Sequence, residues 1–172
     1  MTLQLLWSHA TTDVPAGGLS RQYEASETER SALANALGIR EIGKLVADYT
    51  INSIAGGGWR LKGTVSAEVV QACVVSLESV PQSLVDDFDV EFWPHGKCDE
   101  FGEEKSVLQG PDVETLEGET IDVGRIVFET LSAGLDPYPR KSGVDFDWQD
   151  KAALRSQVGG PFAGLSRLKD RS

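Results

Sequence analysis

Residues 119–141, ETIDVGRIVFETLSAGLDPYPRK, carry a helix start signal, a periodic middle and a stop signal in series, and they constrain the fold more than any other segment. Asp122 can cap a helix through its carboxylate, and Ile121 and Ile126 stand at the positions of a hydrophobic staple around that cap. The apolar stripe that follows comprises Ile126, Val127, Thr130, Leu131 and Leu135. Gly134 and two prolines then end the pattern. The segment therefore predicts an amphipathic helix over about 122–135 that packs on a core.

A second helix is predicted over about 26–37. Ser26 and Glu29 fit a capping box, alanines raise the helix propensity of the segment, and Gly38 stops it. Because Leu33 and Leu37 share one face, this helix should also pack on the core.

Four segments favour strands, because they are rich in β-branched and aromatic residues or alternate apolar with polar positions. They are residues 3–6, 39–54, 59–75 and 84–93. Pro81 is expected in the bend before the last of them, and no helix-length crossover separates the last three, so these predict an antiparallel meander. A short strand is also expected near Val113, and Glu119 and Ile121 are expected to pair briefly with the sheet.

Together these elements predict an α+β protein. We expect an antiparallel sheet of about four to six strands, able to curl toward a partly closed barrel, packed against one principal helix over about 122–135 and a second helix over about 26–37. The length of 172 residues suits one domain. Residues 1–158 should form it, with an exposed acidic loop at about 94–118, and residues 159–172 should form a basic amphipathic tail.

Three stretches, in the order of the chain, resemble one known family. IDVGRIVFETLSAGLDPYPRK is similar to the "(I/V)DLGE-VxEELxLALPxxP" segment of the YceD family, the large ribosomal RNA subunit accumulation proteins, and reads closest to its alphaproteobacterial branch. VSAEVVQACVVSLESVPQSLVDDFDVEFWP resembles the family's cysteine-bearing hairpin, and GPFAGLSRLKDR resembles its terminal "NPFAxLxxLK". The resemblance implies a role in the processing, stability or assembly of the large ribosomal subunit rather than catalysis.

The chain departs from this family at one position. Many members carry a C-x-x-C pair, whereas this chain reads CVVS, with Ser76 in the place of the second cysteine. Closed zinc sites usually show paired ligands at short spacing, and here Cys73 and Cys98 are 25 positions apart. We therefore expect no metal and no cofactor, with Cys73 as a buried strand thiol; a metal pair completed by His9 or His95 is the alternative.

No sequence pattern indicates an enzyme. His9 and His95 are isolated and expected at the surface, and no G-x-S-x-G nucleophile pattern accompanies them. The three glycines at 56–58 lack the Lys-Ser/Thr of a phosphate loop, so they predict a hairpin turn. The carboxylates within residues 86–91 mostly alternate along a strand, which favours a solvated face over acid–base chemistry.

The net charge of −11 is concentrated in one region. Residues 78–122 hold 14 acidic and two basic residues, whereas the rest of the chain is nearly neutral. A nucleic-acid binder normally presents a basic stripe, so any contact with RNA must be local or made through a protein partner. An acidic surface suits a basic partner such as a ribosomal protein, and the loop at 94–118 is either such a face or simply solvated.

Two basic stretches keep a binding function open, and their residues are Tyr138, Arg140, Lys141, Arg155, Arg167, Lys169 and Arg171. In DPYPRK the tyrosine is held between two prolines and precedes the first two cations; such a loop could stack a base and meet phosphates, or it could simply end the helix. The other four cations lie beside an apolar stripe, which could bind RNA or a partner groove, or dock onto its own domain.

Two functions follow from these observations. The first is a non-catalytic factor that supports large-subunit ribosomal RNA accumulation, processing or ribosome assembly by binding precursor RNA or an RNA–protein intermediate. The alternative is an acidic module that binds a ribosomal protein or an assembly enzyme without touching RNA. The N-terminal apolar patch has no basic start, and no apolar run has the length of a membrane span, so we expect a cytoplasmic protein without membrane or small-molecule partners.

Overall fold

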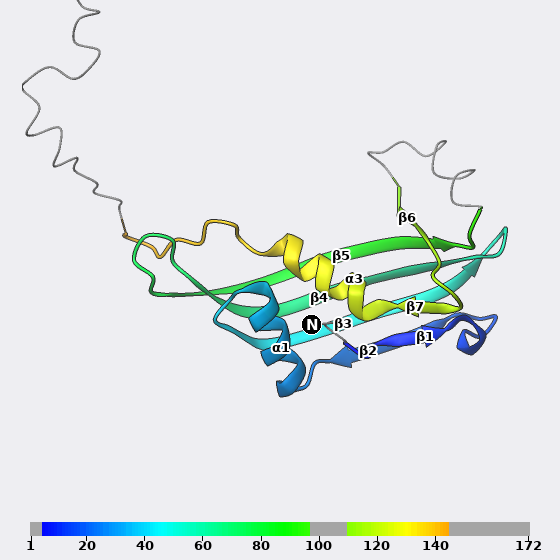
Figure 1. The fold of residues 1–172 in the computed structure, drawn as a ribbon, viewed down its shortest axis with the longest axis horizontal. Helices are drawn as coiled ribbons and strands as arrows, with labels where there is room; N and C mark the ends of the chain where they lie inside the picture. Colours follow the sequence, from blue (N-terminus) through cyan, green and yellow to red (C-terminus); the bar gives the residue numbers. More distant parts are fainter. Residues whose placement is uncertain (1–4, 97–109, 145–172) are drawn as a thin grey trace, which may run out of the picture. The chain divides into compact units, whose positions relative to one another are not determined.

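The computed structural model describes residues 5–96 and 110–144 (Figure 1). Its elements, in chain order, are β1 (Ser8–Ala10), η1 (Thr11–Asp13), β2 (Leu19–Glu24), α1 (Glu27–Leu37), β3 (Glu41–Ile54), β4 (Gly58–Ala72), β5 (Ser79–Trp93), β6 (Asp112–Thr115), β7 (Thr120–Asp122) and α3 (Val123–Gly134). All of them belong to one compact unit, residues 1–142. The domain boundary predicted after residue 158 lies outside the described residues.

The main sheet has five strands in the order β2–β3–β4–β5–β6. The first four are paired antiparallel, as the meander predicted, and β6 pairs parallel with the end of β5. The short strand expected near Val113 is thereby confirmed. The sheet is open, with β2 and β6 at its edges, so the fold is α+β without a closed barrel.

Both helices and one face of the sheet share a single core. Figure 1 shows α3 crossing the sheet over β4, and α3 also contacts β5, while α1 contacts β3. Side chains without exposed surface meet there, among them Leu33, Leu45, Leu61, Val65, Val127 and Leu131. Burial of this apolar surface is the main stabilising contribution, at roughly 25 cal/mol per Å² of apolar area.

Local sequence signals explain where each helix begins and ends. The Asp122 carboxylate accepts a hydrogen bond from the Arg125 amide at 3.0 Å, which caps α3, and the staple residues Ile121 and Ile126 are both buried. At α1 the capping box forms in both directions, and Gly38 ends the helix in the left-handed conformation with φ 66°. Both predicted helices are thus confirmed, within one or two residues.

Three expectations about strands were wrong. Pro81 lies inside β5, opposite Val70, rather than in a bend. Leu5 and Leu6 are not in a strand, and the N-terminal strand begins instead at Ser8, where it pairs with β7 in a separate two-stranded sheet. The segment containing Glu119 and Ile121 therefore pairs with the N-terminus and not with the main sheet. Strand β2 was not predicted, because its exposed polar residues hide the period of a strand.

Candidate functional site

The chain that leaves α3 packs against the turn between β4 and β5. The Val74 amide donates to the Pro139 carbonyl at 2.9 Å, and Gln71 Nε2 donates to the Asp136 carbonyl at 2.9 Å. The Asp136 carboxylate also accepts a hydrogen bond from the Tyr138 amide at 2.9 Å. These contacts fix the proline-rich loop in place, as its composition predicts.

This loop presents the first three predicted site residues at the surface. Tyr138 is 71% exposed, which leaves its ring accessible for stacking. Arg140 is exposed and forms no ion pair with any described residue, whereas Lys141 Nζ donates to the Glu78 carboxylate at 2.8 Å. The other four predicted cations, Arg155, Arg167, Lys169 and Arg171, lie outside the described residues.

Folding adds three residues to this place that the sequence did not point to. Arg40 reaches across from the start of β3, where it donates to Ser79 Oγ at 2.9 Å and to the Leu77 carbonyl. Leu77 and Val74 carry exposed apolar side chains, and Leu77 has φ 60°, a conformation uncommon outside glycine. We call the six residues together the exit surface: Arg40, Val74, Leu77, Tyr138, Arg140 and Lys141.

A buried thiol lies beneath the exit surface. Cys73 has no exposed surface, as predicted, and its Sγ accepts hydrogen bonds from the amides of Ser76 and Lys141, both at 3.4 Å. The Ser76 hydroxyl and amide, with the Lys141 amide, lower the pKa of Cys73 to about 6, although burial acts in the opposite direction. The thiol therefore links the turn after β4 to the proline-rich loop, since Cys73 and Lys141 are 68 residues apart in the chain.

The histidines differ from one another. His95 is exposed, as predicted, but His9 is half-buried and therefore was wrongly placed at the surface. Its Nε2 lies 2.6 Å from the hydroxyl of Tyr49, and its ring contacts Tyr23. Among the described residues no cluster of three or more His, Cys, Asp or Glu could hold a metal ion, and Cys98 lies outside them.

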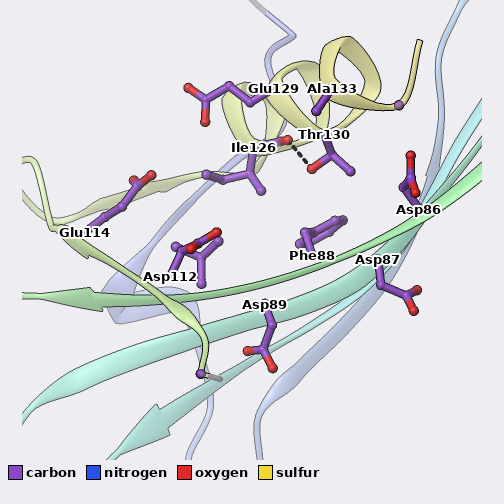
Figure 2. A pocket seen from close by; sticks show the side chains of 13 residues that line it. Asp86, Asp87, Phe88, Asp89, Asp112, Glu114, Ile126, Glu129, Thr130 and Ala133 are labelled. Atoms are coloured by element: carbon purple, nitrogen blue, oxygen red, sulfur yellow. Dashed lines mark hydrogen bonds between the residues drawn. The ribbon is translucent and has the colours of Figure 1, made fainter. Parts of the chain in front are cut away.

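An open groove of about 690 Å³ runs between α3, β5 and the segment that leads into β6. Six carboxylates line it, from Asp86, Asp87, Asp89, Asp112, Glu114 and Glu129, and none of the described residues that line it is basic. Figure 2 shows Phe88 on β5 lying beneath Ile126 and Thr130 of α3, with acidic side chains on both sides. We call this the acidic groove. The loop predicted to be acidic, at about 94–118, lies mostly outside the described residues.

The expectation that most acids within residues 86–91 lie on a solvated face of β5 is confirmed for Asp87 and Asp89 and wrong for Glu91, which is buried. Asp87 and Asp89 point away from α3, as a solvated face requires (Figure 2). Asp86 lies on the helix side, as its place next to Asp87 requires, and shares that side with Leu84 and Phe88. The groove thus combines acids from both faces of β5 with acids of α3 and β6.

Comparison with protein families identifies a family whose model matches more than half of this chain. The model of the family described as "Large ribosomal RNA subunit accumulation protein YceD" matches residues 61–169. No curated protein and no solved structure matches. The matched range includes most of the exit surface and the whole of the acidic groove. Within the described part of the chain, no helix has the length and apolar character needed to cross a membrane.

Proposed function

Since this chain belongs to the YceD family of large ribosomal RNA subunit accumulation proteins, we propose that it acts as a non-catalytic factor in the cytoplasm that binds precursor ribosomal RNA, or an RNA–protein intermediate, through its exit surface. The observation that carries this proposal is the convergence of an exposed tyrosine with three cations. Arg40 directly precedes β3, and Arg140 and Lys141 come from the loop after α3.

The chemistry of the exit surface suits single-stranded RNA. An aromatic ring such as that of Tyr138 can stack on any base, while cations beside it can meet the phosphates on either side. The loop is held by backbone hydrogen bonds, so the ring and the cations need little ordering when they bind. The acidic residues concentrated within 78–122 would help to confine RNA to this surface, because they repel phosphates elsewhere on the protein.

A salt titration with fragments of large-subunit ribosomal RNA tests the proposal. The double variant Arg140→Ala/Lys141→Ala should bind more weakly and with a shallower dependence on salt. With fewer phosphates neutralised, binding of the variant releases fewer counterions from the RNA. Loss of the exposed ion pair from Lys141 to Glu78 should cost the fold little, because water and salt screen the attraction between exposed charges.

Matched variants separate this surface from general charge effects. Arg21→Ala/Lys62→Ala removes the same charge from the sheet and should leave RNA binding unchanged. Tyr138→Ala should lower the affinity by about 1–3 kcal/mol per stacked base, whereas Tyr138→Phe should not. Equal weakening by both double variants, or no binding by the wild type at low salt, would contradict direct RNA contact at this place.

A second candidate function is an acidic module that binds a ribosomal protein or an assembly enzyme without touching RNA. The observation that favours it is the acidic groove, where six carboxylates and no basic side chain stand among the described lining residues, in a chain of net charge −11. In that case charge reversal within residues 99–119 should abolish association with the partner, while Arg140→Ala/Lys141→Ala should not.

A further inference from the structure

The outer edge of β5 is left open along most of its length. Strand β5 has 15 residues, and β4 pairs with it from Ser79 to Phe92 on one side. On the other side β6 has only four residues and pairs with Val90–Trp93. Within the part of the chain that the structure describes, no strand pairs with this edge before Val90.

The direction of the ladder shows which backbone groups face this open edge. The Val70 carbonyl accepts a hydrogen bond from the Arg40 amide, so Val70 directs its backbone polar groups toward β3. Its partner Pro81 therefore directs its own groups away from β4, where the missing amide hydrogen costs no ladder bond.

Because these directions alternate with a period of two, Ser83, Val85 and Asp87 also present their amides and carbonyls outward. The Leu116 amide donates a hydrogen bond to the Trp93 carbonyl at 2.7 Å. This bond agrees with the alternation, since Trp93 has an odd number, as Pro81, Ser83, Val85 and Asp87 do, and should direct its backbone groups outward. Ser83, Val85 and Asp87 make no backbone hydrogen bond on the outer side to any described residue. Three amides and three carbonyls in a row thus form an unpaired template for another strand.

The surroundings of the edge specify the charge of such a strand. Asp86, Asp112, Glu114 and Glu129 lie on the helix side of the acidic groove, and Asp87 and Asp89 lie on the other side (Figure 2). Arg125 pairs with Glu114 and Glu129, and Arg60 pairs with Asp89 at 2.7 Å.

Asp86, Asp87 and Asp112 form no ion pair with any described residue, so they remain as uncompensated negative charge beside the edge. The Val85 side chain, which is 68% exposed, offers an apolar contact on the face of the sheet away from α3. Phosphates would be repelled here, whereas lysine and arginine side chains would find partners on both faces of an added strand.

We propose that the open edge of β5 binds an extended lysine- or arginine-rich segment of a partner protein, which adds to the sheet as a strand beside α3. Backbone hydrogen bonds to Ser83, Val85 and Asp87 would supply affinity, and the acidic groove would select basic side chains. A segment of about five residues is long enough to span the three outward positions. The inference deepens the second candidate function and does not depend on RNA binding at the exit surface.

Binding of a capped peptide of nine alternating lysines and valines to the full-length protein, followed by fluorescence polarisation, tests the proposal. We expect binding that weakens as salt is added, and none to the matching peptide of glutamate and valine. Val85→Pro removes one outward amide without touching the ladder to β4, so it should weaken binding at least about ten-fold. Val85→Thr, which keeps the amide and the strand propensity, should bind within about two-fold of the wild type.

A second arm uses the wild-type protein, so it holds even if Val85→Pro does not fold. Peptides with N-methyl groups on alternate residues lose the amide hydrogens of one edge only. Methylation in one of the two alternating sets should therefore abolish binding, and methylation in the other should not. Equal effects of both sets, equal binding by Val85→Pro and Val85→Thr, or no binding by the wild type would each overturn strand addition. Val85→Pro should still bind RNA like the wild type, which separates this result from that of the exit surface.

Discussion

At the scale of single residues, the packing on the helix-facing side of the sheet depends on a few positions that no local sequence pattern identifies. Gly63 is one of them, because a Cβ there would lie 2.6 Å from both Phe88 Cζ and Tyr49 Cβ. The missing side chain lets two aromatic residues from neighbouring strands pack over β4. Tyr49 in turn stacks with Tyr23, at 6.3 Å between ring centroids, and holds His9.

His9 makes stability depend on pH. Burial, helped by the positive charge of Arg21 and opposed by Asp13, lowers the pKa of His9 below its ordinary value of 6.5. The unfolded chain therefore binds this proton at a higher pH than the folded chain, so the folded state loses stability as the pH falls below about 6.5. We expect the free energy of unfolding of the wild type to drop more between pH 7.5 and pH 5 than that of His9→Gln.

Urea unfolding at the two pH values measures this difference. The exposed His95 provides the matched control, His95→Gln, because it makes none of these ring contacts. If the free energies of unfolding of the wild type and His9→Gln differ by the same amount at both pH values, folding does not lower the pKa of His9.

At the scale of elements, each helix is specified by its own ends. The Glu29 amide donates to Ser26 Oγ at 3.3 Å, and the Ser26 amide donates to the Glu29 carboxylate at 2.8 Å. Gly38 then supplies the left-handed residue that ends the helix. These contacts span at most a few residues, so the sequence alone is sufficient to predict them.

Removal of this cap gives an element-scale prediction. Ser26→Ala should lower the free energy of unfolding by about 1 kcal/mol, because the Glu29 amide loses its acceptor at the helix N-terminus. Ser31→Ala, an exposed change in the interior of the same helix, should be neutral or slightly stabilising, since alanine has the higher helix propensity. Chemical denaturation of both variants measures the comparison, and equal effects would argue against the cap.

Across the unit of residues 1–142, the N-terminal segment joins elements that are far apart in the chain. The Trp7 carbonyl accepts from the Gly124 amide at 3.0 Å, its indole Nε1 donates to Glu29 at 3.1 Å, and its ring stacks on Tyr23 at 5.4 Å. One buried residue therefore contacts α1, β2 and α3.

Loss of the Trp7 ring should therefore destabilise the whole unit. Trp7→Ala is expected to lower the free energy of unfolding by about 3–5 kcal/mol, the usual range for removal of a large buried aromatic side chain. Trp7→Phe keeps most of the apolar contact and loses the hydrogen bond to Glu29, so its cost should be nearer 1 kcal/mol. Unfolding followed by circular dichroism distinguishes the two, and a similar small effect of both would mean that the segment contributes little.

The sequence by itself determined whatever depends on residues close together in the chain. The caps and stripes of both helices, the three long strands and their antiparallel meander, and the burial of Cys73 all follow from periodicity, propensity and turn chemistry. The three motifs in series also identified the family, since such strings are read without coordinates. Tyr138, Arg140 and Lys141 could be named for the same reason, because a proline-bounded aromatic–basic loop is visible in the sequence.

Only the tertiary structure decided what depends on distant pairing. Arg40 joins the exit surface because β3 begins beside the turn after β4, and Cys73 reaches Lys141 across 68 residues. The parallel pairing of β6 and the open edge of β5 are likewise invisible in the sequence, because strand partners and register are set by which apolar faces bury one another. Alternation shows that neighbours such as Asp86 and Asp87 face opposite ways, but packing against α3 decides which face is inside.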